Sequence, residues 1–68
     1  MAVGKNSKSE LKLWAKECIR KTKYNQQTRN ILVRQADFII DNGGYRGDVS
    51  DKWKAMGYNT ADIPDMYP

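Results

Sequence analysis

The apolar side chains of residues 25–44 recur at the spacing of an α-helix. At about 100° per residue, one face of that helix collects Leu32, Val33, Ala36, Ile39 and Ile40. Ile31 and Phe38 widen the face on one flank, so the apolar arc exceeds the ~100° stripe usual for a surface helix. We therefore expect this helix to be covered from more than one side.

Residues with capping and stop chemistry set the two ends of this central helix. Asn25 is a preferred N-cap residue because its short side chain accepts from a first-turn N–H, and Thr28 is the competing start. Gly43 and Gly44 predict the stop, since glycine adopts the left-handed conformation that ends many helices. The central helix is therefore expected over residues 26–42.

A further helix is predicted before the central one. Ser7 and Glu10 have the spacing of a capping box, which predicts a first helix over residues 8–23. The apolar face of this helix is formed by Leu11, Trp14, Ala15, Cys18 and Ile19. The connection to the central helix is short, so we expect the two helices to be antiparallel.

A third helix is expected over residues 49–56, after a flexible connection at residues 43–47. Asp48 is predicted as its N-cap, and Asp51 favours the positive end of the helix dipole. The inward-facing residues of this helix are Val49, Trp53 and Met56. One more turn is expected near residues 60–62.

Together these elements predict an all-α fold, a small three-helix domain. A chain of 68 residues forms one domain, and a domain of this size buries only about 60% of its unfolded surface. We expect a flexible basic arm at residues 1–7, a single helical domain at 8–64 and an irregular tail at 65–68. In the core we expect Leu32, Ala36 and Ile39 to pack on Trp14 and Cys18, with Trp53 closing the other side.

Charge is distributed unevenly along the chain. Residues 1–34 contain nine cations and two acidic residues, whereas residues 35–68 contain three cations and six acidic residues. This polarity predicts a basic side and an acidic side on the folded molecule. Asp41 is unusual, because a carboxylate in the last turn of a helix opposes the helix dipole. We expect a cation to offset it, from Arg46 or from a lysine of the first helix.

A row of cations follows one side of the first helix and continues into the arm. Its members are Lys5, Lys8, Lys12, Lys16, Arg20 and Lys23. Such a row binds phosphates without reading bases, because each neutralised phosphate releases counterions. We therefore interpret the chain as a small non-enzymatic nucleic-acid-binding or regulatory protein. The competing interpretation of the row is a solvated face that keeps the molecule dissolved.

A protein-binding adaptor or inhibitor, which binds and blocks a larger enzyme or complex, is the alternative function. Apolar surface that three short helices leave uncovered would favour a protein interface or a homodimer. The basic side would suit an acidic protein surface. The candidate partner contacts are Leu13, Tyr45, Arg46 and Tyr58.

A helix-turn-helix is a sharper version of the nucleic-acid hypothesis, with the third helix reading DNA bases. Asp48 and Asp51 argue against it, because they sit at the helix end that normally approaches the bases. The expected connection before this helix is also longer than the usual three or four residues.

The chain has no histidine and one cysteine, which excludes an intrachain disulfide and the usual zinc-ligand spacing. The commonest general base is missing and no glycine-rich phosphate loop is present, so we expect no enzyme, metal or cofactor. Cys18 lies on an apolar face and is interpreted as a core residue. No stretch resembles the apolar core of a signal peptide or a membrane span, so we expect a cytoplasmic protein without membrane contact.

Overall fold

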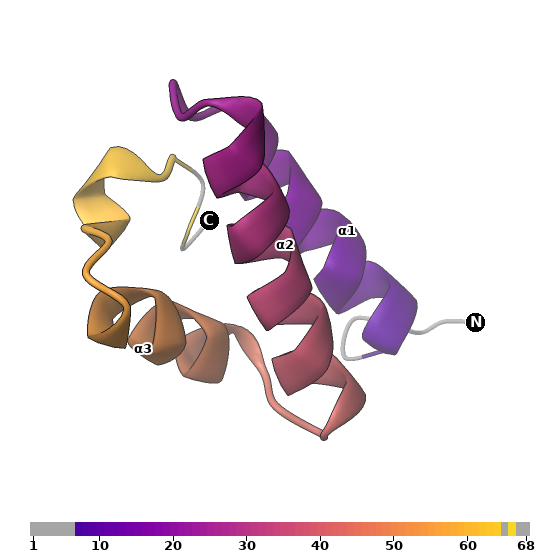
Figure 1. Ribbon diagram of the computed structural model, residues 1–68. Coiled ribbons are helices and arrows are strands. Elements are labelled where there is room, and N and C mark those ends of the chain that lie inside the picture. The colour runs from indigo at the N-terminus through magenta and orange to yellow at the C-terminus, as the bar shows by residue number, and fades with distance from the viewer. Residues whose placement is uncertain (1–6, 65, 67–68) are drawn as a thin grey trace.

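The computed structural model describes residues 7–64 and residue 66 of the chain. Its elements are α1 (Lys8–Arg20), α2 (Gln26–Asp41), α3 (Arg46–Ala55) and the short 3₁₀ turn η1 (Thr60–Asp62). Figure 1 shows α1 and α2 side by side and antiparallel, with α3 lying across the direction of the pair. The predicted all-α domain of three helices is confirmed. The expectations for residues 1–6, including Lys5, and for residues 65, 67 and 68 fall outside the described residues.

Polar side chains cap the first turns of α1 and α2. Ser7 Oγ accepts from the backbone N–H of Glu10 at 3.2 Å, as the capping-box spacing predicted. Asn25 Oδ1 accepts from the backbone N–H of Thr28 at 2.8 Å. Each bond satisfies a first-turn donor that has no partner within the helix. Asn25, and not Thr28, therefore starts α2.

Two glycines end α2 at the predicted place. Gly43 has φ of +89°, the left-handed region that other residues rarely adopt. The N–H groups of Gly43 and Gly44 donate to the carbonyls of Ile40 and Ile39, at 3.0 and 2.8 Å. This pair of bonds is a Schellman motif. Gly44 also has no room for a side chain, because an added Cβ would lie 2.9 Å from the Ile39 carbonyl oxygen.

The first and third helices have boundaries that differ from the prediction. α1 ends at Arg20, because the Thr22 hydroxyl donates to the carbonyl of Ile19 at 2.7 Å and takes up an acceptor that further helix would use. α3 begins at Arg46, so Asp48 is not its N-cap. The Asp48 carboxylate instead reaches back and accepts from the backbone N–H of Tyr45 at 2.7 Å.

The early start of α3 also corrects the predicted flexible connection at residues 43–47. The chain between α2 and α3 comprises residues 42–45 only, a four-residue turn. The Schellman bonds of α2 fix its first half and the Asp48 carboxylate fixes its last residue. Both ends of the turn are therefore held by hydrogen bonds.

The core lies where α1 and α3 contact opposite flanks of α2. Its buried apolar residues are Leu11, Ala15, Cys18, Ile19, Leu32, Ala36, Ile40, Val49, Trp53, Ile63 and Met66. The Trp53 indole N–H donates to the Leu32 carbonyl at 3.2 Å and ties α3 to α2. The predicted core is confirmed for Leu32, Ala36, Cys18 and Trp53, whereas Trp14 and Ile39 are half-buried at its edge.

The outer flank of the apolar arc on α2 stays uncovered. Ile31 is 38% exposed and Phe38 is 65% exposed. α1 and α3 both pack against α2, as the width of its apolar arc predicted. Ile31 and Phe38 nevertheless stay exposed. The described part of the chain therefore presents an aromatic side chain to water in the last turn of its central helix.

Candidate nucleic-acid interface

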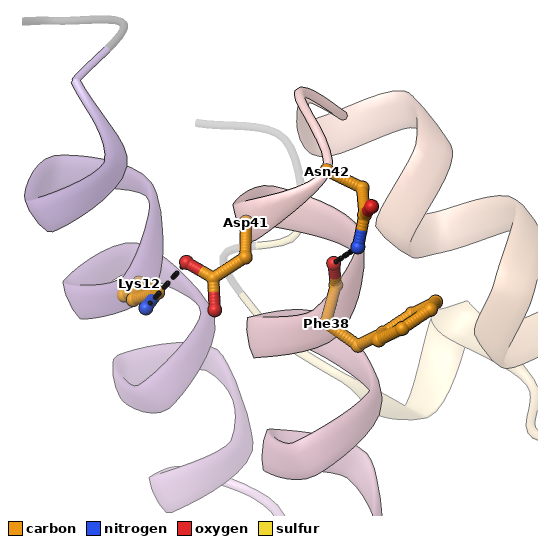
Figure 2. A network of polar contacts seen from close by, with 4 residues as sticks. All are labelled: Lys12, Phe38, Asp41 and Asn42. Carbon is orange, nitrogen blue, oxygen red and sulfur yellow. Dashed lines mark hydrogen bonds and ion pairs between the residues drawn. The ribbon is translucent and has the colours of Figure 1, made fainter.

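A carboxylate of α2 lies beside the basic row of α1. Lys12 Nζ lies 2.8 Å from Asp41 Oδ1, across the α1–α2 interface (Figure 2). The hydrogen bond between them lowers the pKa of Asp41 and raises the pKa of Lys12. The expected cation at the end of α2 is thus confirmed as a lysine of the first helix. Arg46 instead lies over the Trp14 ring, 5.1 Å from its centroid.

The Lys12–Asp41 pair divides the basic row of α1 into an N-terminal and a C-terminal half. The charges of Lys12 and Lys8 both help to lower the pKa of Asp41, and the charge of Asp37 helps to raise that of Lys12. The N-terminal half of α1 therefore lies beside the acidic end of α2. The acids offset the positive charges there, so the candidate surface narrows to the C-terminal half of the row, at Lys16 and Arg20.

Lys16 and Arg20 lie on the wall of a shallow cleft of about 170 Å³ between α1 and α2. The residues around this cleft are Lys16, Ile19, Arg20, Gln26, Arg29, Asn30 and Val33. Three of these side chains are cations, two are amides and none is a carboxylate. The cleft also opens beside the N-terminal end of α2, where the helix dipole favours anions. We call this feature the cationic cleft.

Arg29 is the member of the cationic cleft that the sequence interpretation did not assign to binding. One guanidinium nitrogen, Nη2, donates to the Thr22 carbonyl at 2.8 Å and anchors the side chain to the α1–α2 connection. Its Nε–H is buried and has no hydrogen-bond partner among the described residues. The signal in the sequence was a cation inside an apolar arc, one turn after the N-cap of α2.

Arg20 borders the cationic cleft and also forms an ion pair with Glu17 of its own helix. It lies 2.8 Å from the carboxylate of Glu17, and this hydrogen bond raises the pKa of Arg20. Both side chains are exposed, and exposed pairs of this kind contribute little free energy because water and salt screen them. A phosphate can therefore compete with Glu17 for the guanidinium of Arg20.

A second hollow continues from the cationic cleft over the surface of α2. Its wall consists of Asn30, Val33, Arg34 and Asp37, and its volume is about 370 Å³. Asn30 and Val33 belong to both hollows, so the two are neighbours on α2. Arg34 extends the cationic surface, and the Asp37 carboxylate marks its limit.

Lys23 lies apart from Lys16 and Arg20, in the connection between α1 and α2. It borders another hollow of about 340 Å³ together with Lys21, Thr22, Tyr24 and Asp62. Burial, followed by the charge of Asp62 and the influence of Tyr58, raises the pKa of the Tyr24 phenol. Its ring meets Tyr58 edge-on with centroids 5.7 Å apart. Lys23 therefore adds positive charge at the same end of the α1–α2 pair as the cationic cleft.

The residues assigned to a protein partner have different surroundings. Leu13 is 61% exposed and Tyr45 is 55% exposed, so both side chains reach solvent. Arg46 lies over Trp14, and Tyr58 contacts Tyr24 at the edge of the core. Arg46 and Tyr58 thus contact different aromatic side chains. Leu13 and Tyr45 are the two that present apolar surface.

α3 carries both signs of charge on its outer side. Asp48, Asp51, Lys52 and Lys54 are all exposed; Asp48 lies in the first turn of the helix, and Asp51 lies near its middle. The four-residue turn before α3 has the length found in helix-turn-helix proteins, which corrects the expectation of a longer one. Asp48 still opposes an approach of this end to DNA.

The described residues show little that would support other chemistry. Within residues 7–64 and 66, His, Cys, Asp and Glu side chains form no group of three that could hold a metal ion. None of the helices in these residues has the length and apolarity needed to cross a bilayer. Comparison with known proteins found no matching family model, no matching curated protein and no matching solved structure.

Proposed function

We propose that this protein binds the phosphate backbone of a nucleic acid, without catalysing a reaction. The observation that carries the proposal is the cationic cleft, in which Lys16, Arg20 and Arg29 meet with no carboxylate on the wall. Phosphate oxygens match arginine guanidinium groups in geometry and charge. The refined site contains Lys16, Arg20, Lys23, Arg29 and Arg34, in place of the whole basic row of α1.

The formal net charge of +4 supports this proposal, as does the position of the cations on the molecule. Lys12 is paired with Asp41, whereas Lys16 has no ion pair among the described residues. Attraction to a polyanion therefore favours the end of the α1–α2 pair that contains the cleft. Backbone contacts of this kind give little sequence preference.

A matched pair of double variants tests the proposal. Lys16→Gln with Arg20→Gln removes two charges from the cleft, and Lys52→Gln with Lys54→Gln removes two charges from α3. All four side chains are exposed, so neither pair should unfold the domain. Fluorescence anisotropy with labelled oligonucleotides would measure affinity at several salt concentrations.

The cleft pair should weaken binding strongly, and the α3 pair should weaken it only slightly. Loss of two phosphate contacts should also flatten the slope of log affinity against log salt by about 1.5. Equal loss from both pairs would contradict the proposal, because net charge alone would then explain binding. Circular dichroism of each variant would verify that the helices remain.

The exposed Leu13 supports a second candidate function, a protein-binding adaptor or inhibitor. A leucine that is 61% exposed on the outer side of α1 contributes nothing to the core and favours an apolar contact with another protein. Salt separates the two candidates, since phosphate binding weakens steeply with salt and an apolar interface does not. A partner that is retained at high salt and lost in Leu13→Ala would favour this second function.

A further inference from the structure

We infer that the nucleic acid is single-stranded, with one base stacked on Phe38 and a neighbouring phosphate held by Arg34. The inference rests on the proposed function and assigns the ligand class. Its starting point is Phe38, which is 65% exposed in the last turn of α2. Figure 2 shows the ring pointing away from α1, on the side of α2 opposite the Lys12–Asp41 pair.

Phe38 is presented on a rigid part of the molecule. Its backbone carbonyl accepts from the Asn42 side-chain amide at 2.8 Å and from the Asn42 backbone N–H at 3.2 Å. These bonds hold the last turn of α2 directly above the Schellman motif. An exposed aromatic ring fixed on a helix loses little conformational freedom when a flat group stacks on it.

Arg34 lies one helical turn before Phe38, on the same face of α2. It is exposed and makes no ion pair with any of the described residues. It also borders the hollow that shares Asn30 and Val33 with the cationic cleft. The exposed surface of α2 therefore leads from the cleft over these two residues to Arg34, and Phe38 adjoins Arg34 one turn further along the helix.

This surface has the size and polarity for a short stretch of one strand. Arg34 and Phe38 are four residues apart, which corresponds to about 6 Å along the helix axis on one face of α2. Asp37 borders the second hollow together with Arg34, so a phosphate has to approach Arg34 from the side away from this carboxylate. Phe38 lies on that side, so a phosphate held there by Arg34 has a neighbouring base beside the ring.

A duplex cannot use Phe38 in this way. Its bases are stacked on each other, so the face of an aromatic ring reaches them only when a base is unpaired. Unpaired bases all have a π-face, and each stacked base strengthens binding by about 5- to 150-fold. Duplex reading by the N-terminal end of α3 is opposed by Asp48 in its first turn.

The test compares one labelled strand, free and annealed to its complement, in anisotropy titrations with the full chain. The wild type should bind the free strand more tightly than the duplex. Phe38→Ala should weaken binding of the free strand by about 5- to 150-fold and leave duplex binding unchanged. Phe38→Trp keeps a stacking surface and should restore binding of the free strand.

Leu13→Ala is the matched control, since it removes a comparably exposed apolar side chain from the other helix. It should leave both affinities unchanged. Unchanged affinity of Phe38→Ala for the free strand would overturn the inference, as would equal wild-type affinity for strand and duplex. So would a wild-type dimer, measured by sedimentation without oligonucleotide, that Phe38→Ala dissociates.

The outcomes separate this inference from the proposed function. Binding that depends on Lys16 and Arg20 but not on Phe38 would keep backbone binding and reject the stacked base. Absence of binding to strand and duplex would reject both.

Discussion

Asp41 occupies a position where a negative charge is unfavourable, in the last turn of α2. The Lys12 ammonium group compensates for it at 2.8 Å and lowers the pKa of the carboxylate. A carboxylate with a lowered pKa stabilises the fold above its unfolded pKa and loses this effect as pH falls through the folded value. For Lys12 the sign is opposite, because its raised pKa makes the contribution disappear at alkaline pH.

Asp41→Asn should therefore lower the free energy of unfolding slightly at neutral pH. The difference from the wild type should shrink as pH falls from about 4, the usual pKa of an unfolded aspartate, towards the lowered pKa of the folded carboxylate. Urea unfolding of both proteins across this pH range measures it, with Asp51→Asn as a control on α3. A variant more stable than the wild type at neutral pH would mean that repulsion by the helix dipole exceeds the attraction of Lys12.

Ser50 offers a second test at the residue scale. Its side chain is fully buried in α3, and its hydroxyl oxygen has no partner among the described residues. Ser50→Ala should raise the free energy of unfolding by about 1 kcal/mol, because it removes an unsatisfied buried polar group and alanine favours helix. The exposed Ser9→Ala is the control in urea unfolding. A loss of stability in Ser50→Ala would show that the hydroxyl is satisfied after all.

At the scale of elements, the two glycines on either side of the α3 start have opposite roles. An added Cβ at Gly44 would meet the side chain and the carbonyl of Ile39, whereas one at Gly47 would meet nothing within 4 Å. Gly44→Ala should therefore lower the free energy of unfolding by about 1–3 kcal/mol, as overpacking does. Gly47→Ala, in the first turn of α3, should raise it by about 0.5–1 kcal/mol. Thermal and urea unfolding check both, and the same sign for the two variants would contradict this boundary of α3.

The caps explain which element boundaries the sequence predicts well. Asn25 and Gly43 act through short local bonds, so their roles are visible in the residues alone. Asp48 is ambiguous, because a carboxylate serves equally as an N-cap or as the third residue that reaches back to the cap. The structure resolves the ambiguity, because α3 begins at Arg46 and the Asp48 carboxylate accepts from the backbone N–H of Tyr45.

At the scale of the whole molecule, the antiparallel pairing of α1 and α2 places charges from the basic and acidic halves of the sequence side by side. The halves 1–34 and 35–68 do not become two sides, because the pairing brings Asp41 beside Lys12. Part of the candidate site was predictable, since Lys16 and Arg20 follow from the spacing along α1. The place of Arg29 in the site was not predictable, because Arg29 falls within the apolar arc of α2 and only the folded structure shows that it borders the cationic cleft.

The salt dependence of binding by the wild-type protein tests the central claim most directly. Anisotropy titrations of a labelled single strand between about 50 and 200 mM salt give the slope of log affinity against log salt. Five contacts, from Lys16, Arg20, Lys23, Arg29 and Arg34, predict a slope of about −3.5. No binding tighter than about 100 μM, or a slope near zero, would contradict the account.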